Sequence, residues 1–104
     1  MSITYFFVAI LYGGTPVVKE VQITNITTNK SKELSENDIN KLTEFIKSAT
    51  NPLYVKCFCK YIITFRENDE IVEYATNGVI FRIVGTSIYY KFPEDIYSLL
   101  EGLE

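Results

Sequence analysis

The chain has no histidine and no tryptophan, and it has only two cysteines and three prolines in 104 residues. Without histidine, the commonest proton shuttle and the commonest metal ligand are both missing. The catalytic motifs GxSxG, HExxH, GxGxxG and the Walker loop are missing as well. Ten basic against thirteen acidic side chains give a formal charge of -3, which argues against a general binder of nucleic acid or anionic membranes. We therefore expect no metal, no cofactor and no catalytic residue.

The longest apolar run, Ile3 to Tyr12, is too short to span a bilayer, and no lysine or arginine precedes it as in a secretory signal. We expect a strand here and a cytoplasmic protein. Both odd and even positions are apolar, so the strand needs cover on both faces. Self-association would provide that cover, and the candidate homodimer interface is Phe6, Val8, Ile10 and Tyr12. A different partner protein, or a strongly coiled sheet that closes on itself, is the alternative.

The two cysteines, Cys57 and Cys59, are separated by one residue. On a strand, side chains at i and i+2 point to the same face along nearly parallel directions, so we predict no disulfide between them. A closed thiolate metal site needs about four ligands, and no further cysteine or histidine is present. The sequence favours two buried small hydrophobic residues, with redox or metal chemistry as the alternative.

Hydrophobic residues make up 47% of the chain, which is enough for one folded domain over residues 1–104. Turn signals predict a hairpin of Ile3 to Tyr12 with Val17 to Ile26, and then a polar loop from Thr27 to Glu33. Ser35 is a good helix N-cap, and apolar residues continue at helical spacing up to Ala49.

After Asn51-Pro52 the pattern predicts four meandering strands and a short C-terminal helix that begins at Pro93. The expected fold is α+β, with two layers, the element order ββαββββα, a mainly antiparallel sheet and two helices on one face. The stripe that would place the second helix against the core consists of Ile96, Leu99, Leu100 and Leu103.

Asn77-Gly78 is a strong signal for a type I′ hairpin turn. This turn would set Tyr74 opposite Phe81 and Glu73 opposite Arg82, while the next turn sets Phe81 opposite Tyr90. One face of the meander then becomes almost wholly apolar and is the predicted core: Val55, Cys57, Cys59, Tyr61, Ile63, Phe65, Val72, Tyr74, Val79, Phe81, Ile83, Ile88, Tyr90 and Phe92.

The opposite face would carry every lysine and arginine after residue 53, together with aromatic and aliphatic side chains. Such a face is either an ordinary solvated sheet surface or a recognition surface, because interleaved aromatics and cations suit an acidic protein or a single nucleic-acid strand. The candidate partner-binding residues are Tyr54, Lys56, Phe58, Lys60, Arg66, Arg82, Tyr89 and Lys91.

The sequence favours a small non-enzymatic protein-binding module that acts through this face. Motif-free acidic proteins of viruses and mobile elements often neutralise a larger enzyme, so analogy suggests an inhibitor, immunity or anti-defence protein. One alternative is a small enzyme that processes a ligand or nucleotide with Glu73, Arg82 and Tyr89, which requires a cleft. Another is a binder of single-stranded nucleic acid, which the acidic net charge disfavours.

Overall fold

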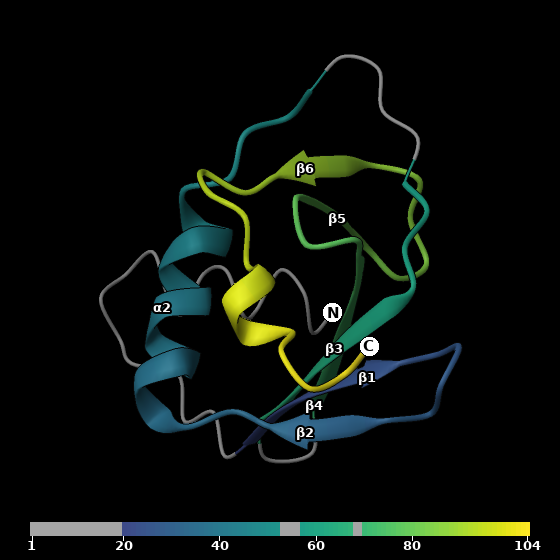
Figure 1. Ribbon diagram of the computed structural model, residues 1–104. Coiled ribbons are helices and arrows are strands. Elements are labelled where there is room, and N and C mark those ends of the chain that lie inside the picture. Colours follow the sequence, from purple (N-terminus) through teal and green to yellow (C-terminus); the bar gives the residue numbers. More distant parts are fainter. Residues whose placement is uncertain (1–19, 53–56, 68–69) are drawn as a thin grey trace.

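The computed structural model describes residues 20–52, 57–67 and 70–104. These residues form one six-stranded antiparallel sheet in the order β2-β1-β3-β4-β5-β6, one α-helix and one 3-10 turn (Figure 1). The elements are β1 Glu20–Asn25, β2 Ser31–Glu33, α2 Glu36–Lys47, β3 Tyr61–Glu67, β4 Glu70–Thr76, β5 Ile80–Ile83, β6 Tyr89–Lys91 and η1 Tyr97–Leu99. The prediction of an α+β fold with an antiparallel sheet is confirmed, whereas the prediction of two helices is wrong.

The N-terminal part of the sheet differs from the prediction. β1 lies between β2 and β3 and pairs with both, whereas the sequence predicted a hairpin with Ile3 to Tyr12. β2 falls in the predicted polar loop, because a polar edge strand has no apolar face for hydropathy to reveal. The predicted first strand and the candidate interface Phe6, Val8, Ile10 and Tyr12 lie outside the described residues.

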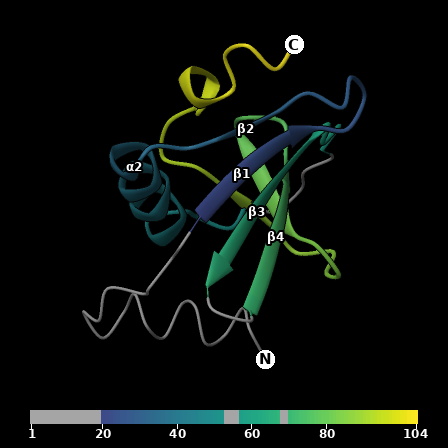
Figure 2. The same cartoon turned by 90° about the horizontal axis from the view of Figure 1, so that it is seen from below.

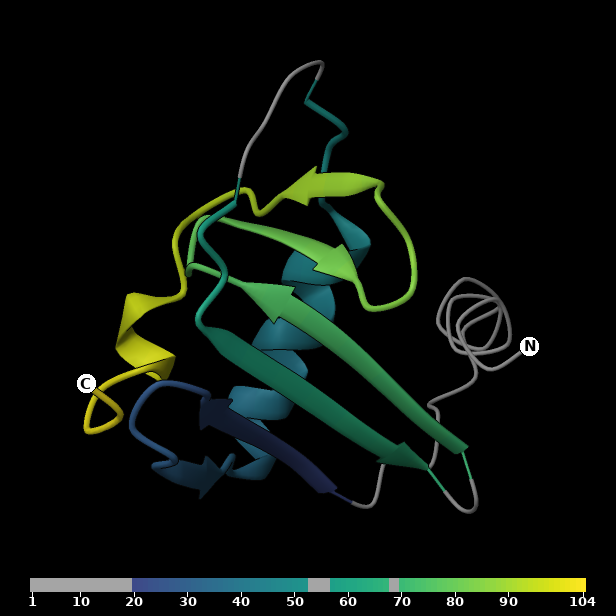
Figure 3. The ribbon, with the colours of Figure 1, turned by 90° about the vertical axis from the view of Figure 1, so that its right-hand side faces the viewer.

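The helix α2 begins and ends close to the predicted positions. The Ser35 hydroxyl accepts a hydrogen bond of 3.3 Å from the backbone N–H of Asp38, which is the expected N-cap. Leu42 and Ile46 are buried against the sheet, and Figure 3 shows α2 lying across one face of it. Within the described ranges, no helix has the length and apolar character needed to cross a membrane.

The C-terminal segment covers the core without forming an α-helix. Ile96, Leu99, Leu100 and Leu103 are all buried, as their spacing predicted. The backbone N–H groups of Leu99, Leu100 and Leu103 each bond to the carbonyl three residues earlier, at 2.9, 3.0 and 3.1 Å. This is 3-10 geometry, which is common in short capping segments because the nucleus of an α-helix is costly to form. The apolar spacing therefore predicted the contacts correctly and the helix type wrongly.

The core lies between the sheet and the layer made by α2 and the C-terminal segment (Figure 2). The predicted core residues that are buried in the structure are Tyr61, Ile63, Phe65, Val72, Tyr74, Phe81, Ile83 and Phe92. Val79 and Tyr90 are half-buried, as are both cysteines, and Val55 lies outside the described residues. Ile88 was wrongly predicted, since it is 49% exposed in the loop before β6.

Two of the three predicted strand registers are confirmed. Phe65 pairs with Val72, and Phe81 pairs with Tyr90. Between β4 and β5, however, Tyr74 pairs with Ile83 rather than Phe81, a shift of two residues. A shift of two leaves every side chain on its predicted face, so the division of the sheet into a core face and an outer face survives.

Candidate functional site

The candidate site is the outer face, defined as the sheet face turned away from α2 and η1. Strand pairing aligns Thr24, Ile62, Ala75, Arg82 and Tyr89 in one row across β1, β3, β4, β5 and β6. Figure 3 looks onto this face, with α2 behind the sheet. The row thus holds one polar, two apolar, one cationic and one aromatic side chain.

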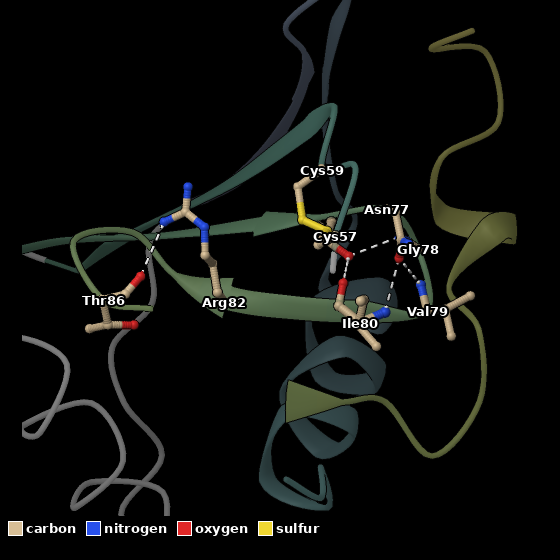
Figure 4. The surroundings of a disulfide bond; sticks show 9 residues. Cys57, Cys59, Asn77, Gly78, Val79, Ile80, Arg82 and Thr86 are labelled. Carbon is tan, nitrogen blue, oxygen red and sulfur yellow. Dashed lines mark hydrogen bonds between the residues drawn. A yellow bond between two sulfur atoms is a disulfide. The ribbon is translucent and has the colours of Figure 1, made fainter. Parts of the chain in front are cut away.

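Part of the outer face is covered. By the alternation of side chains along β4 and β5, Ala75 and Ile80 belong to the outer face, yet they are only 2% and 7% exposed. The chain that leads into β3 crosses this face beside the β4–β5 turn (Figure 3), and the cysteine pair of that segment lies near Ile80 (Figure 4). The prediction failed here because it continued β3 backwards as a flat strand, whereas residues 57–60 belong to no strand.

Cys57 and Cys59 are joined by a disulfide, which corrects the prediction of two free thiols. Their Cα atoms lie 5.1 Å apart, within the ordinary range for a disulfide. The prediction assumed the parallel side-chain directions of a strand, and that assumption does not apply to the irregular chain before β3. The bridge closes a loop around a single residue, Phe58.

Phe58 is 93% exposed, the highest exposure among the large hydrophobic residues that the structure describes. Lys60 is also exposed, and its Nζ lies 5.4 Å from the centre of the Tyr61 ring, within cation–π range. The segment that covers Ile80 therefore presents an aromatic side chain and a cation to solvent.

The two arginines of the outer face already have partners within the chain. The Arg66 Nε atom lies 3.6 Å from Oε1 of Glu20, and the two residues are paired across β3 and β1. This ion pair is about half-exposed, so it stabilises the fold little. The half-buried Arg82 donates from Nη1 to the backbone carbonyl of Thr86 at 3.4 Å, which fixes its position over β5.

Glu73 and Arg82 do not form the predicted cross-strand pair. Arg82 pairs with Ala75, and the Glu73 carbonyl instead accepts the N–H of Val84 at 3.0 Å. The Glu73 carboxylate accepts a hydrogen bond of 3.4 Å from the hydroxyl of Thr64. The register shift thus separates Glu73 from Arg82 and Tyr89, which remain directly opposite each other.

The remaining predicted site residues differ in their exposure to solvent. Tyr89 is half-buried on β6, and Lys91 is exposed at its end. The backbone of Lys91 is fixed by two hydrogen bonds with Thr50, at 3.0 and 2.7 Å. Tyr54 and Lys56 lie outside the described residues. In the parts of the chain that the structure describes, Lys60, Arg82 and Lys91 have no carboxylate within ion-pair distance.

Sequence reasoning missed two exposed apolar residues, Ile71 and Val84. Ile71 lies opposite Arg66, and the N–H of Val84 bonds to Glu73, so both follow the parity of the outer face. Neither residue was among the candidate partner-binding residues. The alternation of side chains along β4 and β5 is the signal that would have identified both.

Tyr74 is a buried polar residue on the core side. Its hydroxyl has no hydrogen-bond partner among the described residues, and its ring packs edge-on against Phe65 and Phe81 at centroid distances of 5.5 Å. Burial raises the pKa of Tyr74 above its ordinary value, and the nearby Tyr90 adds to this effect. Within the described ranges, no group of three or more acidic or cysteine side chains is arranged to hold a metal ion.

Comparisons with known proteins give no further guide to the site. No protein-family model matches the sequence, and neither a search of curated proteins nor a search of solved structures finds a match. The outer face and the segment before β3 therefore have to be interpreted from their own chemistry.

Proposed function

We propose that the chain is a small protein-binding module whose outer face takes an acidic partner. The observation that carries this proposal is the exposed Phe58 beside Lys60. Aromatic side chains are the commonest anchors of protein interfaces. Cations without a carboxylate partner steer an acidic surface towards such an anchor.

The rest of the face supports the same interpretation. Arg82 and Tyr89 lie side by side on β5 and β6, and Ile71 and Val84 add exposed apolar surface. Interfaces combine these residue types, with aromatic and arginine side chains enriched over the remaining surface. By analogy with other small acidic proteins, the activity would be inhibition of a larger protein, as in immunity or anti-defence proteins. The enzyme alternative gains no support from the register, because Glu73 is not directly opposite Arg82.

The test is capture of the partner from the native host, followed by affinity measurements with the purified pair. Phe58→Ala should weaken binding by about tenfold or more, as expected for an interface anchor. Lys60→Glu should also weaken binding and should lower its salt sensitivity. Lys41→Glu is the matched control. Lys41 lies on α2, on the other side of the sheet from the outer face, and its Nζ lies 5.7 Å from the centre of the Phe45 ring. Equal affinity for Lys60→Glu and Lys41→Glu would reject the surface.

The proposed homodimer is tested by the mass of the purified chain in solution. The disulfide bears on the proposed cytoplasmic location, because stable disulfides are typical of oxidising compartments and cytosolic ones are usually transient. In a cytoplasmic protein, this disulfide would have to be reduced and re-formed reversibly.

A further inference from the structure

The Cys57–Cys59 bridge differs from a structural disulfide in the length of chain that it closes. It encloses one residue, and the loop-closure entropy that a disulfide removes from the unfolded chain grows with loop length. A bridge across so short a loop does little to connect distant parts of the fold. The core of the described residues is formed by other side chains, and both cysteines are only half-buried.

The bridge is also accessible to a reactant. Residues 57–60 belong to no strand, and Phe58 is almost wholly exposed between the two cysteines. Figure 4 shows the disulfide beside the β4–β5 turn, on the surface of the sheet rather than inside its core. Thiol–disulfide exchange requires an approach to one sulfur, so access of this kind decides which bridges react.

The sequence on both sides of the bridge is basic. The sequence around the bridge is Lys56-Cys57-Phe58-Cys59-Lys60, so each cysteine has a lysine as its neighbour. No aspartate or glutamate occurs between Glu44 and Glu67. Nearby cations stabilise thiolates, which are both the attacking and the leaving groups in exchange.

We propose that Cys57 and Cys59 form a reversible thiol–disulfide exchange site whose substrates are soluble thiols. A substrate thiolate attacks one sulfur, the Cys57–Cys59 bond breaks, and a mixed disulfide forms while the other cysteine leaves as a thiolate and takes up a proton. A second substrate thiol resolves the mixed disulfide. Two substrate thiols are thereby oxidised to one disulfide, and the cysteine pair gains two electrons and two protons. The exchange site shares Phe58 and Lys60 with the proposed binding surface. Exchange is measured with soluble thiols and needs no partner protein, so its failure is distinguishable from a failure of partner binding.

The experiment equilibrates the full chain with mixtures of reduced and oxidised glutathione, quenches with acid, alkylates free thiols and counts them by mass. We expect the count to change between zero and two as the ratio [GSH]²/[GSSG] rises, with an unchanged circular dichroism spectrum. A bridge that resists excess dithiothreitol would overturn the proposal, as would two thiols that persist in oxidised glutathione alone. Unfolding on reduction would assign the bridge a structural role instead.

Single variants test the chemistry of each step. Cys59→Ser should trap a mixed disulfide that adds one glutathione to Cys57, and Cys57→Ser should trap it on Cys59. Lys60→Gln should slow the exchange by about threefold or more, because a neighbouring cation is lost. Lys41→Gln, on α2, should leave the rate unchanged. Failure to trap either mixed disulfide, or equal rates for the two lysine variants, would overturn the proposal.

Discussion

The side-chain amide of Asn25 donates a hydrogen bond of 2.7 Å to the backbone carbonyl of Leu103, 78 residues further along the chain. The Oδ1 atom of Asn25 also accepts the N–H groups of Thr27 and Thr28, at 2.8 and 3.2 Å. One buried side chain therefore shapes the β1–β2 turn and attaches the C-terminal segment to it. Lys30 and Lys32 add bonds from Nζ to the carbonyls of Glu104 and Glu101, both at 3.0 Å.

Asn25→Ala should lower the free energy of unfolding by about 2–3 kcal/mol, because it leaves buried backbone groups without partners. Urea denaturation measures this change. Gln22→Ala is the control, because Gln22 lies on the same strand as Asn25 and makes an exposed hydrogen bond to Ser31. Its loss should cost less than about 0.5 kcal/mol. Similar losses for both variants would contradict the role of Asn25.

Gly78→Ala should destabilise the fold more than Gly85→Ala. Both glycines have positive φ, 101° and 95°, so an alanine is strained at either position by about 1–2 kcal/mol. A Cβ at position 78 would also lie 2.6 Å from Cε1 of Tyr97, whereas at position 85 it meets nothing within 4 Å. The difference between the two melting temperatures therefore reports the contact with the C-terminal segment. Tyr97→Ala should restore part of the loss in Gly78→Ala and nothing in Gly85→Ala.

Tyr74→Phe should leave stability unchanged or increase it, by up to about 2 kcal/mol, because it removes a buried hydroxyl that has no partner among the described residues. The effect should depend on pH. The folded state disfavours ionisation of Tyr74 and so raises its pKa, and this contribution is fully present below the ordinary tyrosine pKa of about 10. Above that pH the unfolded chain loses the proton first, so wild type loses stability as pH rises.

Tyr74→Phe has no hydroxyl to ionise at this position, so it should not lose stability in this way as the pH rises. Its stability relative to wild type should increase by up to about 1.4 kcal/mol per pH unit above pH 10. Urea denaturation at pH 8 and pH 11 checks this, and Tyr97→Phe, at an exposed residue, serves as the control. A constant difference between Tyr74→Phe and wild type across this range would contradict the assignment.

Asn77→Gly should destabilise the β4–β5 turn, although Asn and Gly both suit a type I′ turn. Oδ1 of Asn77 accepts the N–H groups of Val79 and Ile80, at 2.9 and 3.0 Å, and glycine cannot replace these bonds. We expect a loss of about 1–2 kcal/mol in the free energy of unfolding. Asn77→Asp keeps the acceptor and should remain near wild type. A neutral Asn77→Gly would indicate that the side chain does not shape the turn.

This turn shows where sequence reasoning failed and why the failure had limited effect. Asn-Gly predicted two central residues with positive φ, whereas among the described residues Asn29 is the one non-glycine residue with positive φ. The Asn77 side chain made a longer turn, and the register moved by two. Alternation along the strands was unaffected, so Phe65 and Phe81 are buried as predicted.

Local signals gave reliable results where one physical cause dominates. The Ser35 cap and the apolar spacing after it located α2. β2 was missed because its three residues are polar and are held as a strand by pairing with β1, a non-local effect. The bridge between Cys57 and Cys59 was missed for a similar reason, since the path of the chain before β3 depends on its packing over the β4–β5 turn. The cationic outer face followed from the alternation of side chains along the strands. The burial of Ala75 and Ile80 depends on the path of the chain before β3, and the loss of the Glu73–Arg82 pair depends on the register of β4 and β5.

Both edges of the described sheet are short. β2 and β6 have three residues each, and the outer side of β6 is already bonded to Thr50. Little backbone is left for an incoming strand, so recognition by β-strand addition has almost no template here. A macromolecule that binds this sheet has to contact its side chains. Specificity would therefore depend on the identity of the surface side chains rather than on the geometry of the main chain.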